Sequence, residues 1–86
     1  MRENDMRPTF KTSPPLRLSD VRRGQYATVC GFAPDFPAAR QAHLMAYGLT
    51  PGAQVRVVQH SPVTVVQVEN LEIALERSLA EGIRIG

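Results

Sequence analysis

Four side chains of types that commonly bind transition metals are spread along the 86-residue chain: Cys30, Asp35, His43 and His60. Metal sites that are visible in a sequence usually place their ligands three or four residues apart on a helix, or in a C-x-x-C pair. None of these four residues has such a partner, so the sequence predicts no metal site and no cofactor. Cys30 fits a small apolar strand residue, His43 the exposed side of a helix and His60 a hairpin end.

The sequence also lacks the patterns of nucleotide hydrolysis and nucleophilic catalysis. It has no G-x-x-x-x-G-K-[ST] loop, and no serine–histidine or cysteine–histidine pair has a spacing typical of a catalytic family. Carboxylates cluster late in the chain, at Glu69, Glu72, Glu76 and Glu81. As general acid and base they would need to share a cleft, and a solvated face fits a domain of this size better. We therefore do not expect an enzyme.

Side chains typical of interfaces surround a predicted helix end: His43, Met45, Tyr47 and Leu49. Methionine adapts its shape to a partner, and tyrosine offers a large contact area with few rotatable bonds. The alternative is that Tyr47 and Leu49, together with Leu44, only fill one end of the fold. His43 and Met45 lie off that line and are better contact candidates. A second possible surface is the strand predicted at 63–68, to which a partner strand could add.

The segment AARQAHLMAYGLTPG, residues 38–52, predicts a helix followed by two glycine-dependent turns. Residues 38–47 contain no glycine or proline, and their apolar members recur at spacings of three and four. Gly48 can end the helix in the left-handed conformation, with Leu49 packed on the last turn. Pro51 and Gly52 suit the second and third positions of a type II turn. Asp35 is the expected cap at the helix start.

Alternating apolar residues predict four strands and a short closing strand, at residues 25–32, 53–60, 63–68, 71–75 and 83–85. Gly31 indicates a bulge in the first strand. The inward-facing residues expected on the later strands are Val55, Val57, Val66, Val68, Leu71, Ile73 and Leu75. Asn70 is expected to supply positive φ in a two-residue turn, and Ser78 to cap a helical turn that ends at Glu81.

These elements predict a mostly β fold with one to three short helices. Short strands joined by tight turns favour a small closed barrel, because closure removes edges that would otherwise aggregate. The helix at 38–47 would plug one open end. The smallest architecture that fits is an SH3-like β-barrel.

Composition indicates one small domain behind a basic leader. Residues 1–15 hold three prolines and few core candidates, so we expect a flexible leader and a folded domain from 16 to 86. Residues 1–23 carry six of the ten Lys/Arg and three of the eight acids. This leader is a solvated tail or a contact for an anionic membrane or acidic partner, and the modest net charge of +2 does not favour nucleic acid. No signal peptide or membrane span is evident, which predicts a cytoplasmic protein.

The chain from Leu16 to Ile85 resembles the FeoA family. The resemblance rests on spaced motifs: Leu18 with Gly24, Ala27, Val29 and Phe32; Leu44 with Tyr47-Gly48-Leu49, Pro51-Gly52 and Val55-x-Val57; and Ile73-Ala74-Leu75 with Ala80, Ile83 and Ile85. Glu69-Asn70 stands where the family has a glycine before the fourth strand. The family's fold is an SH3-like barrel.

The resemblance implies a non-catalytic accessory role in bacterial ferrous iron uptake. FeoA-like proteins act with FeoB, a GTP-hydrolysing Fe(II) transporter of the inner membrane, and are thought to modulate it. The protein would then be peripheral to the membrane through this partner. The alternative is a stand-alone SH3-like regulatory module that senses metal or pairs with a metal-dependent transcription regulator, because similar domains end iron-dependent repressors.

Overall fold

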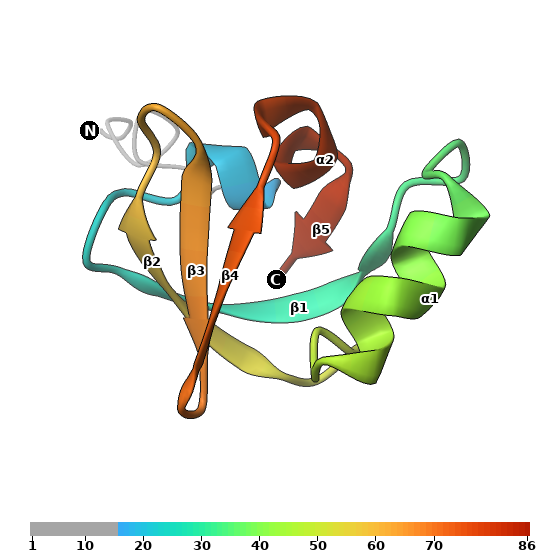
Figure 1. Ribbon diagram of the computed structural model, residues 1–86, viewed down its shortest axis with the longest axis horizontal. Coiled ribbons are helices and arrows are strands. Elements are labelled where there is room, and N and C mark those ends of the chain that lie inside the picture. Colours follow the sequence, from blue (N-terminus) through green and yellow to red (C-terminus); the bar gives the residue numbers. More distant parts are fainter. Residues whose placement is uncertain (1–15) are drawn as a thin grey trace, which may run out of the picture.

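The computed structural model describes residues 16–86, and the flexible leader expected at residues 1–15 lies outside them. The described residues form five strands, two α-helices and one 3₁₀ helix (Figure 1). In chain order these are η2 (Leu18–Asp20), β1 (Tyr26–Phe32), α1 (Ala38–Ala46), β2 (Gln54–Gln59), β3 (Thr64–Val68), β4 (Leu71–Leu75), α2 (Arg77–Glu81) and β5 (Ile83–Ile85). Within residues 16–86 no helix is long and apolar enough to cross a membrane. The predicted mostly β fold with short helices is confirmed.

The strands form one antiparallel sheet in the spatial order β4-β3-β2-β1-β5. Strand β1 joins its two halves, because residues 26–28 pair with β2 and residues 29–32 pair with β5. The register shifts between Val29 and Gly31, so the predicted bulge is present. A bulge bends a strand, and here it lies at the point where β1 exchanges one neighbour for the other.

The core lies on the inner face of this curved sheet. Its fully buried apolar side chains come from every part of the described chain: Leu18, Val29, Leu49, Val55, Val57, Val66 and Ile83. On β3 the buried residues are Thr64, Val66 and Val68, as expected for a strand with one covered face. The inward faces predicted for the second and third strands are therefore confirmed.

The sheet does not close into the barrel that we expected. Among residues 16–86, strand β4 pairs only with β3, and β5 pairs with β1. The other side of β5 is occupied by the start of the described chain. The backbone of Arg17 forms an isolated antiparallel β-bridge with that of Arg84, and the Ile85 amide donates to the Leu16 carbonyl at 3.1 Å. Because this segment occupies that side of β5, the described part of the chain leaves β4 without a second strand to pair with.

An open edge also explains the exposure of β4. Of the three residues predicted to face inward, only Leu75 is buried, while Ile73 is half-buried and Leu71 is 40% exposed. Their alternation is correct, but no further strand of the described chain covers them. The partner-strand surface predicted at residues 63–68 was also misplaced, because β3 lies between β2 and β4 and has both sides paired. Within residues 16–86, β4 is the strand with an open side.

Helix α1 covers one end of the sheet (Figure 1). Only Leu44 of this helix is buried, and Leu49 just beyond it is fully buried. Gly48 has φ of +105°, its amide donates to the Met45 carbonyl, and the Leu49 amide donates to the Leu44 carbonyl. This pair of bonds with Leu49 packed near Leu44 is a Schellman motif. The predicted glycine cap is therefore present, and Leu44 and Leu49 fill this end of the fold, whereas Tyr47 is exposed.

The Thr50–Ala53 turn also has the expected form. Gly52 has φ of +93°, and the Ala53 amide donates to the Thr50 carbonyl at 2.9 Å. The turn is fixed to β1, because the Gly52 amide donates to the Val29 carbonyl at 2.7 Å. Two glycines thus set the position of α1 relative to the sheet.

Three local predictions were wrong. Helix α1 has Pro37 at its N-cap and no side-chain cap, so Asp35 does not cap it. Helix α2 has Glu76 at its N-cap, two residues before the predicted Ser78, and no side-chain cap. In the β3–β4 hairpin, positive φ falls on Glu69 at +56° and not on Asn70. The twist of the paired strands selects the turn type of a two-residue hairpin. The general preference of asparagine for positive φ therefore did not identify which of the two turn residues adopts it.

Candidate functional site

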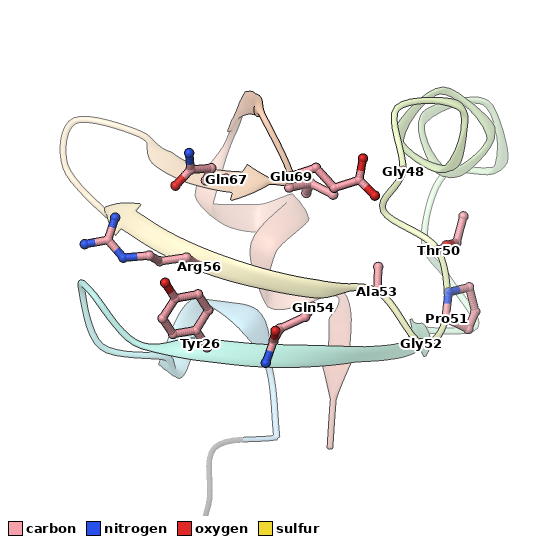
Figure 2. Close-up of a pocket in the computed structure, with 11 residues that line it drawn as sticks. Tyr26, Gly48, Thr50, Pro51, Gly52, Ala53, Gln54, Arg56, Gln67 and Glu69 are labelled. Atoms are coloured by element: carbon pink, nitrogen blue, oxygen red, sulfur yellow. The ribbon is translucent and has the colours of Figure 1, made fainter.

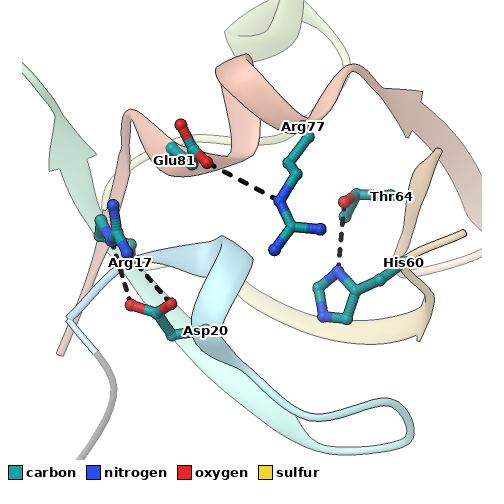
Figure 3. Close-up of polar contacts among 6 residues, drawn as sticks. All are labelled: Arg17, Asp20, His60, Thr64, Arg77 and Glu81. Carbon is teal, nitrogen blue, oxygen red and sulfur yellow. Dashed lines mark hydrogen bonds and ion pairs between the residues drawn. The ribbon is translucent and has the colours of Figure 1, made fainter.

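The four candidate metal ligands are not brought together. Among residues 16–86 no three His, Cys, Asp or Glu side chains are grouped so that they could hold a metal ion. His60 has a structural role instead: its Nε2 donates to the Val21 carbonyl, and its Nδ1 lies 3.2 Å from the Thr64 hydroxyl (Figure 3). A carbonyl oxygen only accepts, so the Nε2 atom of His60 carries a proton.

Two exposed ion pairs hold short elements together (Figure 3). Arg17 Nε lies 3.1 Å from Asp20 Oδ2 across η2, and Arg77 Nε lies 3.7 Å from Glu81 Oε2 across α2. The hydrogen bond and charge of Asp20 raise the pKa of Arg17 further. Both pairs are local and solvent-exposed, so they tie down single turns and do not form a site.

A wide polar hollow lies on the outer face of the sheet (Figure 2). Its volume is about 730 Å³, and its lining residues come from β1, β2, β3 and the glycine turn: Tyr26, Gly48, Thr50, Pro51, Gly52, Ala53, Gln54, Arg56, Gln67, Val68 and Glu69. Amides, one guanidinium and one carboxylate are dispersed over this area. The predicted turn residues Gly48, Pro51 and Gly52 form one rim of it.

A second concave surface lies between α1 and the open side of β4, and we call it the edge groove. It consists of two adjoining depressions of about 190 and 340 Å³ that share Tyr47, Ile73 and Ala74. The remaining lining residues are Arg40, His43, Leu44, Leu71, Glu72, Leu75, Glu76 and Leu79. Aliphatic and aromatic side chains form most of this surface, with charged groups at its ends. This composition suits a protein partner.

The four predicted contact residues lie in different places: two line the edge groove, one lies outside it and one is in the core. His43 and Tyr47 line the groove, with ring centroids 5.0 Å apart and an angle of 31° between the rings. Tyr47 is 51% exposed. Met45 is half-buried outside the groove lining, with its Sδ 3.9 Å from Gln41 Nε2. Leu49 is fully buried, so it belongs to the core and offers a partner no surface.

Sequence reasoning did not find the β4 half of the groove. The sequence predicts Leu71 and Ile73 as inward-facing residues of a closed barrel, in which a partner could not reach them. The signal available in the sequence was that β4 is followed directly by α2 and only a three-residue strand. A last strand of three residues can pair with few residues, so it does not close the sheet onto β4, and β4 keeps an open side.

The family model of the FeoA domain matches residues 16–85. This chain belongs to the FeoA family. The match spans both the helix-turn segment and the β4 strand that form the edge groove. FeoA-family proteins are tied to iron transport and have regulatory or accessory roles.

Solved FeoA structures have the same fold. The solution structure of Chlorobium tepidum FeoA is similar with a TM-score of 0.75 and 29% identity, over 81% of this chain and 68% of that one. Stenotrophomonas maltophilia FeoA in complex with zinc is similar with a TM-score of 0.71 and 28% identity, over 84% and 91%. That protein is described as a prokaryotic SH3 domain protein. The SH3-like architecture is thus confirmed, with the open edge described above.

A manganese-dependent transcriptional repressor also shares the fold, with a TM-score of 0.70 and 19% identity. The similarity covers 85% of this chain but only 42% of the repressor. No curated protein sequence matches the chain.

Proposed function

We propose that this protein is a non-catalytic, cytoplasmic accessory protein of bacterial ferrous iron uptake. In this proposal it binds FeoB, the GTP-hydrolysing membrane Fe(II) transporter, and modulates it, and it reaches the membrane only through that partner. Membership of the FeoA family is the observation that carries the proposal. An activating role in ferrous iron transport is suggested for the Stenotrophomonas maltophilia relative.

The edge groove supports a binding role. It is apolar in its middle, and two of the five large hydrophobic side chains that are exposed among residues 16–86 line it: Tyr47 and Leu71. Aromatic residues at the centre of a surface often dominate binding energy. We propose His43 and Tyr47 as partner contacts, and Met45 as a contact at the margin of the helix.

The test is binding of the purified full chain to the full importer in detergent, and to the importer's cytoplasmic GTP-binding domain, with and without GTP. Saturable binding to either form supports the proposal. The proposal would be overturned if the chain bound neither the full importer nor its GTP-binding domain, whether GTP is present or absent.

Two matched tyrosine variants locate the surface. Tyr47→Ala removes an exposed ring from the groove, and we expect importer affinity to fall about tenfold. Tyr26→Ala removes a ring that is 64% exposed in the polar hollow, and we expect unchanged affinity. The opposite result would place the partner on the outer face of the sheet. Met45→Asp should leave the fold intact, and it should weaken importer binding if the part of the helix around Met45 also contacts the importer.

A second candidate function is that of a regulatory module that senses metal. The zinc complex of the Stenotrophomonas maltophilia relative and the fold shared with a manganese-dependent repressor favour it. Sedimentation of the chain with and without Fe(II) or Zn²⁺ tests it. A metal-dependent change of oligomeric state would support this candidate, and an unchanged state would reject it.

A further inference from the structure

The open side of β4 offers backbone groups that no described residue satisfies by strand pairing. In the β3–β4 hairpin, Val68 pairs with Leu71, Val66 with Ile73 and Thr64 with Leu75 across a two-residue turn. Hydrogen-bonded and non-bonded pairs alternate in antiparallel strands, and the pair that closes a two-residue turn is bonded. The amides and carbonyls of Glu72 and Ala74 therefore point away from β3, toward the edge groove.

The groove beside these backbone groups has an apolar lining. Leu44 of α1 and Tyr47, which directly follows the helix, stand on one side and Ile73 on the other, with Leu79 of α2 at one end. A strand added to β4 would place alternate side chains against this lining. Its remaining side chains would lie on the outer face, on the same side of the sheet as Glu72.

The opposite edge of the same sheet shows how an extended segment covers a strand. There, Leu16 and Arg17 lie along β5 through the Ile85–Leu16 hydrogen bond and the bridge to Arg84. Leu18, which follows directly, is fully buried and anchors the segment. At this edge, backbone pairing and a buried apolar side chain together place a short extended segment along a strand.

The charges at the groove define the segment that fits. Glu72 and Glu76 line it and both are exposed, against one permanently charged cation, Arg40. We infer that an extended segment of the importer, with alternating apolar and basic residues, adds to β4 as a further strand in the edge groove. Its apolar side chains contact Tyr47 and Ile73, and its basic side chains contact Glu72. This inference rests on the proposed function and specifies how the partner binds.

Proline substitution at Ala74 tests backbone pairing directly. Ala74→Pro removes the amide that faces the groove, and proline is tolerated in an edge strand where its nitrogen faces solvent. We expect affinity for the detergent-solubilised importer to fall at least about tenfold. Ala74→Thr is the matched control, because it adds a side chain and keeps the amide, and we expect affinity within about twofold of wild type.

Hydrogen exchange of the wild-type chain gives a second readout that needs no variant. Added-strand pairing should slow exchange at the Glu72 and Ala74 amides when the importer is bound. Glu72→Lys should weaken binding about fivefold at low salt, with a smaller loss at high salt, because the contact is exposed.

The outcomes separate the inference from the proposed function. Weak binding by Ala74→Pro with slowed exchange at residues 72 and 74 supports the inference. If the importer binds wild type and Ala74→Pro equally, or exchange at both amides is unchanged, the inference fails while the proposed function stands. If the importer does not bind wild type at all, both fail. If Ala74→Pro instead dissociates a dimer of this chain, the occupant is a second copy, and the proposed occupant is wrong.

Discussion

The two edges of the sheet differ in what completes them. Strand β5 has three residues and is covered on its outer side by Leu16 and Arg17. Strand β4 has five residues, and within residues 16–86 its outer side faces only the groove beside α1. The covered edge contributes two buried isoleucines to the core, whereas the open edge leaves Leu71 substantially exposed. An edge strand that stays both apolar and accessible is a typical site for partner binding.

The largest expected effect comes from breaking the covered edge. Leu18→Ala removes a fully buried side chain that anchors the segment over β5, and we expect the free energy of unfolding to fall by about 3 kcal/mol. Urea denaturation measures this. The matched control is Leu16→Ala in the same segment, where the side chain is 71% exposed and the change should stay within about 0.5 kcal/mol. Equal losses at both positions would show that burial does not hold this edge.

The second effect concerns the helix that borders the open edge. Gly48→Val combines positive φ with a new Cβ 3.3 Å from Val68 Cγ1, so we expect a loss of about 2 kcal/mol. Thermal unfolding measures it. Gly31→Ala is the control, because Gly31 has no positive φ and an added Cβ meets nothing within 4 Å. Unchanged stability of Gly48→Val would contradict the glycine cap and its role in placing α1 beside β4.

A smaller effect is expected at His60, which ties the covered side of the molecule to β3. His60→Ala removes the hydrogen bonds to the Val21 carbonyl and to the buried Thr64 hydroxyl, at a cost of about 1–2 kcal/mol. His43→Ala, at an exposed position on α1, should be close to neutral. If the two histidine variants are equally stable in chemical denaturation, the His60 bonds contribute nothing measurable.

The smallest effect is a gain at the turn of the open-edge hairpin. Glu69→Gly should raise the free energy of unfolding by about 0.5–1 kcal/mol, because glycine adopts φ of +56° without the steric penalty of a side chain. Asn70→Gly should not stabilise, since Asn70 lacks positive φ. A melting temperature that rises for the Asn70 variant and falls for the Glu69 variant would reverse the assignment of the strained residue.

The sequence predicted the half of the candidate site that α1 and its turn contribute, and it did not predict the half that β4 contributes. Gly48 and Gly52 identified the helix end and the turn, because positive φ is a local requirement that few residues satisfy. His43 and Tyr47 followed from their positions on the helix. The β4 half was missed, since strand alternation gives the same pattern for a paired strand and an open edge.

The sequence by itself determined the strands, their inward faces and the glycine turns. Each of these depends on contacts between residues close in the chain, or on alternation along one strand. Only the tertiary structure decided that Leu16 and Arg17 cover β5, that β4 stays open, and that His60 bonds to Val21. These features pair segments that are distant in the chain, so they depend on how the strands are arranged in space and not on local sequence patterns. The accessible groove between α1 and β4 follows from this arrangement, because β4 is an edge strand of the described sheet.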